Sequence, residues 1–160
     1  MRRTEREVTD KARIAEILAD CKVCRIGLAD AAGVYIVPMN FGFEAQNGRL
    51  LFWFHSADEG RKIRLLRLAA ERGETVGFEL DGGYRLLPGT AACSYTAAYH
   101  SVMGVGYVRF AADRAEKRRG LTLLMQHTAG VEDCTFPDAA LDRVAVFAIE
   151  VASLSCKEHK

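Results

Sequence analysis

The sequence predicts a mainly β protein with helical inserts, folded as a small closed or partly closed barrel of six or seven mostly antiparallel strands. Two observations support this prediction. Short stretches alternate apolar and polar residues and stop at glycine-containing turns, which is typical of strands joined by hairpins. Helical periodicity is confined to a few segments that do not alternate regularly with the strands, so a doubly wound parallel sheet is not expected.

Length and charge narrow the class of protein further. The 160 residues carry a formal charge of +1, with 22 Lys and Arg against 21 Asp and Glu. A chain of this length usually forms one domain, here residues 1–160. The balanced charge argues against a nucleic-acid partner. Without an apolar leader or a run of roughly 20 apolar residues, we expect a cytoplasmic protein with no membrane partner.

The first half of the chain predicts two helices and three strands. A helix begins after Thr9 or Asp10 as N-cap, because its apolar residues share one face: Ile14, Ile17, Leu18 and Cys21. Strands follow at 23–30, 34–44 and 49–55, and Asn47-Gly48 marks a hairpin, so three consecutive antiparallel strands are expected. A capping box, formed by Ser56 and Glu59, then predicts a helix that ends before Gly73.

The second half predicts strands at 75–80, 101–111 and 145–152, with a helix after Asp113 that ends before Gly130. The Gly- and Ala-rich segment 81–100 is expected to be irregular, with one short strand around 95–99. Gly104 and Gly106 indicate a bulge or a close backbone approach within a strand.

Two features stand out as candidates for chemistry. Pro38 lies inside a predicted strand, and because proline cannot donate to a ladder, that strand is expected at a sheet edge that something other than a strand meets. Arg61 and Lys62 lie in the first turn of a predicted helix, where cations oppose the helix dipole. Either an anion such as phosphate occupies this site, or both cations are solvated with Glu59 offsetting them; the residues alone leave both readings open.

Three segments together resemble a known family. Val37-Pro38-Met39-Asn40-Phe41-Gly42, the run Phe54 to Lys62 (FHSADEGRK), and the run Tyr99 to Gly106 (YHSVMGVG) resemble, in order and spacing, the 5-nitroimidazole resistance (Nim) family. That family belongs to the pyridoxamine 5′-phosphate oxidase-like, FMN-binding split barrels. The resemblance spans nearly the whole chain, and it implies an antiparallel split β-barrel that forms a homodimer.

The resemblance also implies an FMN site between two subunits. The backbone of Val37, Pro38, Met39 and Asn40 would face the polar edge of the isoalloxazine. His55 and Ser56 would approach the ribityl chain and phosphate, and Arg61 and Lys62 would bind the phosphate. Ser101, with Val102 beside it, would contact the cofactor from an adjacent strand or the facing subunit.

The expected activity is that of an FMN-dependent oxidoreductase, with a reduced nicotinamide as electron donor and a small electron-poor acceptor, such as a nitroaromatic, as substrate. His55 is the candidate proton donor, because the unperturbed pKa of histidine lies near neutrality. Pyridoxamine phosphate oxidation is not expected, because Tyr35 and Asn40 replace basic residues and the C-terminal segment lacks the Trp and Arg pattern of those oxidases. The alternatives are a non-catalytic flavin- or haem-binding protein, with His55 as axial ligand, and a protein that binds a deazaflavin.

Other polar and thiol groups are interpreted as structural. Cys21-x-x-Cys24 has no second pair at zinc-ribbon spacing, so no metal site is expected. The run 117–119 (KRR) is interpreted as a solvated helix face, and His100 as a surface or interface histidine.

Overall fold

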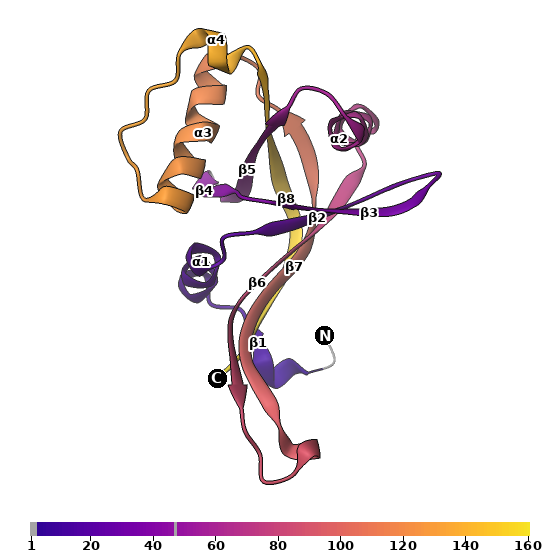
Figure 1. Cartoon of the computed structure of the whole chain (residues 1–160), viewed down its shortest axis with the longest axis vertical. Coiled ribbons are helices and arrows are strands. Elements are labelled where there is room, and N and C mark those ends of the chain that lie inside the picture. Colours follow the sequence, from indigo (N-terminus) through magenta and orange to yellow (C-terminus); the bar gives the residue numbers. More distant parts are fainter. Residues whose placement is uncertain (1–2, 47) are drawn as a thin grey trace.

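The computed structural model describes residues 3–46 and 48–160, and its centre is one antiparallel sheet (Figure 1). Along the sheet the strand order is β3-β2-β6-β7-β8-β5-β4, and β1 pairs with the end of β8. The strands are β1 (Glu7–Val8), β2 (Cys24–Asp30), β3 (Gly33–Met39), β4 (Gly42–Gln46), β5 (Arg49–Ala57), β6 (Thr75–Leu87), β7 (Thr96–Phe110) and β8 (Val144–His159). Curling of this sheet gives the predicted split β-barrel, with eight strands rather than six or seven.

Within the described residues, four α-helices and two short 3-10 helices accompany the strands. These are η1 (Thr4–Arg6), α1 (Lys11–Asp20), α2 (Arg61–Arg72), η2 (Ala92–Ser94), α3 (Arg114–Ala129) and α4 (Asp138–Leu141). α1 begins where predicted, because Asp10 accepts hydrogen bonds from the backbone N–H groups of Ala12 and Arg13. α2 and α3 end at Gly73 and Gly130, both in the left-handed conformation. Among the described residues, no helix combines the length and apolar character that crossing a membrane requires.

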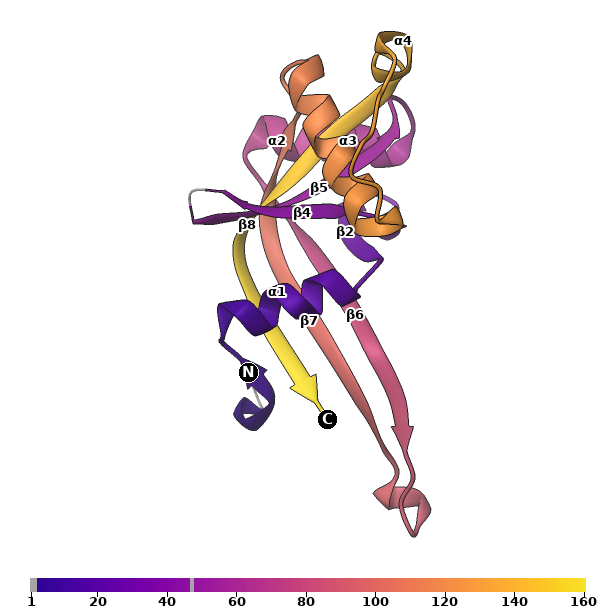
Figure 2. The same cartoon turned by 90° about the vertical axis from the view of Figure 1, so that its left-hand side faces the viewer.

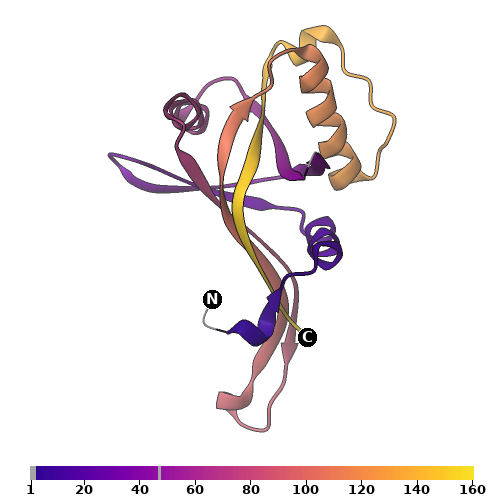
Figure 3. The same cartoon turned by 180° about the vertical axis from the view of Figure 1, so that it is seen from behind.

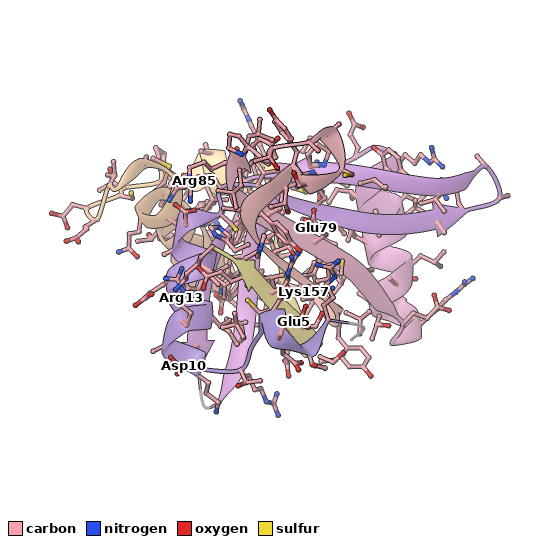
Figure 4. The ribbon with its side chains drawn as sticks, turned by 90° about the horizontal axis from the view of Figure 1, so that it is seen from below. Glu5, Asp10, Arg13, Glu79, Arg85 and Lys157 are labelled. Carbon is pink, nitrogen blue, oxygen red and sulfur yellow. The ribbon has the colours of Figure 1, made fainter. Side chains whose placement is uncertain are left out.

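The apolar core fills the barrel beneath α1 and α2. Ile17 and Leu18 of α1 and Leu66 of α2 pack there with Ile26 and Val102 of the sheet. A smaller cluster joins Trp53 to α3 and α4. α1 lies across β6, β7 and β8 (Figure 2), and Arg13 ties it to β8 by donating to Glu158 through Nε (3.2 Å) and Nη2 (2.5 Å). Figure 4 shows Arg13 on α1 and Lys157 on β8 from this end of the molecule.

The predicted strand 34–44 is two strands, so the prediction of three consecutive antiparallel strands is wrong. β3 and β4 are separated by Asn40 and Phe41, and they lie at opposite ends of the strand order. The chain breaks there because Phe41 turns fully into the core and Gly42 lies against the backbone of α3, where an added Cβ would be 2.4 Å from Leu123. At the predicted hairpin, Asn47 lies outside the described residues and Gly48 has φ +78°.

The predicted capping box at Ser56 is also wrong. Ser56 and Ala57 continue β5 and pair with Ala145 and Val144 of β8, so Ser56 cannot cap a helix. α2 begins later, after Gly60 with φ +105°, and no side chain caps it. Its first backbone N–H groups therefore have no side-chain acceptor.

The segment 81–100 is a long two-stranded arm rather than an irregular loop. β6 and β7 stay paired from Thr75–Tyr107 out to Leu87–Thr96, interrupted by a register shift between Gly82 and Arg85. The arm extends beyond the barrel, as Figures 1 and 3 show. β8 likewise runs on to His159 beside β7. The predicted irregularity at Gly104 and Gly106 is confirmed, with a register shift against β8 and Cβ clearances of only 2.3 and 2.5 Å to its carbonyl oxygens.

Two interpretations of surface residues are corrected. His100 is 7% exposed, so it is a buried rather than a surface side chain. The cations of run 117–119 are not simply solvated: Lys117 donates to the carbonyls of Leu141 and Val144 at 2.8 Å, and its two neighbours pair with Asp138 and Glu44. This face of α3 therefore holds α4 and β4 in place.

One face of the sheet, on the side away from the core, carries exposed apolar residues; we call it the open face. Cross-strand register sets Ile36, Gly27, Gly77, Val105 and Ser153 side by side across five strands. The open face also includes Val34, Met103 and Tyr107. An added Cβ at Gly77 would meet nothing within 4 Å, so the middle of this face is shallow and uncovered.

Candidate functional site

The edge strand β3 carries the first group of predicted site residues. Pro38 is opposite Arg25 of β2, and no strand among the described residues pairs with the other side of β3. The edge position predicted from Pro38 is therefore confirmed. Val37 and Met39 point into the core with 9% exposure, whereas Pro38 and Asn40 are exposed. The outward backbone groups of this strand remain free to bond a ligand.

Asn40 is fixed where β3 leaves the sheet. Its Nδ2 donates to the carbonyl of Lys22 at 2.9 Å, which ties the end of β3 to the segment between α1 and β2. The amide thus holds the split between β3 and β4 at a defined distance from β2. Any ligand along the β3 edge would end against this anchored corner.

The second group of site residues lies where β5 passes into α2. Ser56 is 8% exposed at the end of β5, His55 is beside it, and Lys62 is half-buried in the first turn of α2. Burial lowers the pKa of Lys62, because it disfavours the charged form. Within the described residues, Lys62 makes no ion pair or hydrogen bond.

His55 and Lys62 lie close enough to affect each other. Burial lowers the pKa of His55 below 6.5, and the positive charge of Lys62 lowers it further. At neutral pH the imidazole is therefore mostly uncharged. A half-buried ammonium, a neutral imidazole and an uncapped helix start lie together, which is the donor chemistry that suits a phosphate.

Arg61 is close to this cluster but is already paired. Its Nε and Nη2 donate to the two carboxylate oxygens of Asp30 at 3.0 and 2.8 Å, and its guanidinium carbon lies 4.4 Å from the ring centroid of Tyr35. The conflict between Arg61 and the helix dipole is therefore offset by a carboxylate of the chain itself. The hydrogen bond from Arg61, followed by that from the Ala32 N–H, lowers the pKa of Asp30.

Ser101 and Val102 lie apart from the other site residues, on the central strand β7. Ser101 is partly exposed on the open face, opposite Asp81 and Lys157. Val102 points to the other side, is fully buried, and packs in the core. Only Ser101 presents its side chain to a molecule lying on the open face.

Two residues that hold Arg61 were not predicted to be part of the cofactor site. Asp30 ends β2 and Tyr35 lies within β3, and the Asp30–Arg61 contact spans 31 residues. The one local signal was the position of Asp30 at the end of a strand, where it also accepts the N–H of Ala32 at 2.9 Å. That pattern indicates a turn and says nothing of a partner on α2.

The two binding regions lie along one strand. Tyr35, beneath Arg61, and Asn40, at the end of β3, are five residues apart, which is roughly 16 Å in an extended strand. An elongated ligand with an anionic group at one end and a flat polar group at the other fits this arrangement. The fit rests on the unpaired Lys62, the uncapped α2 start and the open β3 edge.

The cysteines have a different character. Burial raises the pKa of both Cys21 and Cys24 to about 12, so their thiols stay protonated near neutral pH. In the described part of the chain, no three His, Cys, Asp or Glu side chains gather as a metal site would require.

Several solved structures are similar to this chain. Among solved structures, a Bacteroides thetaiotaomicron protein with a proposed role in 5-nitroimidazole antibiotic resistance is 32% identical, with a TM-score of 0.78 over 95% of this chain and 86% of that one. A FAD and haem binding protein from Mycobacterium smegmatis is 17% identical, with a TM-score of 0.79 over 97% of this chain and 74% of that one. The flavocytochrome Anf3 from Azotobacter vinelandii is 18% identical, with a TM-score of 0.75 over 96% and 69%.

The last two similarities show a shared fold alone. A comparison with curated protein sequences finds no match. A family model described as pyridoxamine 5′-phosphate oxidase matches residues 10–158, nearly the whole chain. As its three motifs predicted, the chain belongs to the pyridoxamine 5′-phosphate oxidase family, and it is similar to a 5-nitroimidazole resistance protein over almost its full length.

Proposed function

We propose that the protein is an FMN-dependent oxidoreductase that acts as a homodimer. The observation that carries the proposal is the half-buried, unpaired Lys62 beside His55 at the uncapped start of α2. An unpaired cation in a partly buried position is costly unless a ligand anion completes it, and a helix start favours the same charge. The phosphate of FMN supplies that anion.

The isoalloxazine ring of FMN, when bound, stores two electrons and exchanges hydride at N5. The residues of this chain bind and orient it. Lys62, Arg61 and the N–H groups of α2 hold the phosphate, with Ser56 beside them. Backbone groups of Val37 to Asn40 bond the polar edge of the ring, and Asn40 keeps that edge at a fixed distance from β2.

His55 is the proposed proton donor to the reduced acceptor. Because its pKa lies below 6.5 in this environment, the imidazole is neutral at pH 7 and must first take a proton from solvent. A phosphate at Lys62 offsets the neighbouring positive charge and so favours the protonated imidazole. The proposed anion thus also readies His55 for proton donation.

The proposed dimer forms through the open face. Ile36, Met103, Val105 and Tyr107 are 39–62% exposed there, around the small residues Gly27 and Gly77. A second copy packed on this face would bury these side chains and bring Ser101 against the neighbouring subunit. An FMN bound between the two copies is then held by residues of both.

The proposed substrate is a small electron-poor acceptor, such as a nitroaromatic compound, and the proposed donor is reduced nicotinamide. The 32% identical structure, with its proposed role in 5-nitroimidazole resistance, supports the choice of acceptor. The long edge of β3 is open enough for a small acceptor to reach a flavin from the side.

The visible spectrum of the purified protein, followed by anaerobic addition of NADH or NADPH, tests the proposal. We expect two flavin bands that bleach with the reductant and recover when a nitroaromatic acceptor is added. A colourless protein that takes up no FMN would overturn the proposal. If neither reductant bleaches the flavin bands, the protein binds flavin but does not have the proposed activity.

A second candidate function is binding of flavin or haem without turnover. Two structures of the same fold are named for both kinds of group, one as a flavocytochrome and one as a FAD and haem binding protein. In that case His55 would be the axial ligand, and the spectrum would show a Soret band. A deazaflavin in place of FMN would give a single band at shorter wavelength.

A further inference from the structure

Arg61 is restrained on two sides by the chain itself. Asp30 accepts hydrogen bonds from Nε (3.0 Å) and Nη2 (2.8 Å), and Tyr35 stacks beneath the guanidinium at 4.4 Å. Asp30 is in turn held by the N–H of Ala32 (2.9 Å) and by Arg64 (3.3 Å). Asp30 is a side chain of the β2–β3 turn, so this contact joins that turn to the start of α2.

The restraint leaves a defined part of Arg61 free. A guanidinium has five N–H donors in one plane, and the contact with Asp30 uses its Nε side. Nη1 makes no contact with an acceptor among the described residues, and Nη2 keeps a second N–H. These groups form the end-on edge of the fork, which has the spacing to bind two oxygens of one phosphate.

We propose that Asp30 and Tyr35 are positioning residues that present the end-on edge of Arg61 to the phosphate of the cofactor. The inference rests on the proposed function, because the phosphate is that of FMN. A free arginine side chain loses rotamer freedom when it binds, whereas Arg61 is already ordered before the ligand arrives. Asp30 and Tyr35 therefore increase affinity for the phosphate without touching it.

Asp30 could affect FMN binding in two opposite ways, so the direction of the change on its removal tests the proposal. As a negative charge, Asp30 repels a phosphate, so its removal alone would tighten binding through space. As a holder of Arg61, its removal would loosen binding. The two roles predict opposite changes in FMN affinity, and only the second is the proposal.

The experiment compares FMN with riboflavin, which lacks the phosphate. Dissociation constants are measured by flavin fluorescence for the wild type, Asp30→Asn, Tyr35→Leu and Tyr35→Phe. We expect Asp30→Asn to weaken FMN binding about tenfold and Tyr35→Leu about threefold, with riboflavin binding unchanged. Tyr35→Phe keeps the stacked ring, so this variant should bind FMN with wild-type affinity.

Asp58→Asn is the matched control, because Asp58 also pairs with an arginine of α2, Arg67, outside the proposed site. It should change neither dissociation constant. If Asp30→Asn weakens FMN and riboflavin equally, Asp30 only supports the fold and the inference is wrong. If Asp30→Asn tightens FMN binding, charge repulsion dominates and the inference is again wrong.

The wild type separates this failure from that of the proposed function. A wild type that prefers FMN to riboflavin, combined with an unaffected Asp30→Asn variant, overturns the inference alone. A wild type that binds neither flavin overturns both. A far-UV circular dichroism spectrum and a thermal melt of each variant establish that the chain still folds.

Discussion

The lowered pKa of His55 should make the stability of the folded protein depend on pH. Burial, and then the charge of Lys62, lowers this pKa below 6.5. As pH falls through 6.5, the unfolded chain takes up the proton first, so the free energy of unfolding decreases until the folded pKa is reached. Denaturant unfolding of the wild type and of His55→Gln at several pH values measures this decrease. The part of it that is due to His55 should be absent in the variant. An identical pH dependence in both proteins would contradict it.

The same histidine should report on the proposed phosphate. An anion beside Lys62 offsets the charge that opposes protonation of His55, so FMN should raise the pKa of His55, whereas riboflavin should not. NMR titration of the imidazole, assigned with His55→Gln, gives the pKa in each state. Acceptor reduction should then speed up as pH falls toward the pKa of the FMN-bound form. His55→Ala with an unchanged reduction rate and flavin content would remove His55 from the mechanism.

The charge of Lys62 is expected to lower the stability of the folded chain and to strengthen FMN binding. Its ammonium is half-buried and unpaired among the described residues, and burial lowers its pKa. Lys62→Met keeps the side-chain length without the charge, so we expect a slightly higher Tm but an FMN dissociation constant raised at least ~10-fold. Lys11→Met is the control, because Lys11 is exposed at the start of α1 and is not one of the proposed site residues. Wild-type FMN affinity in Lys62→Met would mean that the phosphate lies elsewhere.

At the scale of elements, the bulge in the β6–β7 arm depends on a close contact with His100. Gly83 has φ +64°, and an added Cβ would lie 2.8 Å from His100 Nδ1. His100 Nε2 is buried 3.1 Å from Asp20 Oδ2, without the alignment of a hydrogen bond. The ring therefore occupies the space that two glycines leave, and it links the arm to α1.

Gly83→Ala should consequently lower the free energy of unfolding by about 2 kcal/mol, the sum of a backbone cost and a steric one. Gly73→Ala isolates the backbone cost, about 1 kcal/mol, because Gly73 has φ +61° and open space around it. In a His100→Ala background the steric part should disappear, so the two glycine substitutions should then cost the same. Urea unfolding of the single and double variants measures this, and an undiminished cost for Gly83→Ala without His100 would refute the contact.

The elements that could be predicted from sequence are those set by local contacts. Asp10 caps α1 and Asp113 caps α3 through backbone N–H groups two or three residues away, and Gly130 ends α3. Ser56 carries an equally good local signal, but it is paired with Ala145 of β8, and that distant pairing overrides the helix start. The arm was missed for the same reason, because β6 and β7 stabilise each other across a Gly-rich stretch that has little strand pattern of its own.

The site follows the same division. Pro38 marked the edge strand, because the missing N–H is a property of the residue itself. The conflict of cations at a helix start was equally visible, but its resolution was not. Asp30 pairs with the Nε side of Arg61, and only the folded chain brings the β2–β3 turn to α2.

For the whole molecule, the open face is the feature that most needs a partner. Its exposed apolar side chains come from β3 and β7, with Gly27 of β2 and Gly77 of β6 between them. Val105, 39% exposed, is opposite Gly77 and Ser153. Isolated exposed apolar residues are ordinary, whereas several on one face of a sheet indicate an interface. If two copies meet there, the centre of the face is where a buried charge would be most costly.

Val105→Glu should therefore convert a dimer to a monomer, raising the dissociation constant of the dimer at least ~100-fold. Val131→Glu is the control, because Val131 is 41% exposed in the loop after α3, away from the open face. Light scattering after size-exclusion chromatography gives the mass of each variant, and the flavin absorbance of the same peak gives its FMN content. Because the cofactor is proposed to lie between subunits, the Val105→Glu monomer should also lose FMN. A monomer that keeps FMN would place the cofactor within one subunit, and a Val105→Glu dimer would place the interface elsewhere.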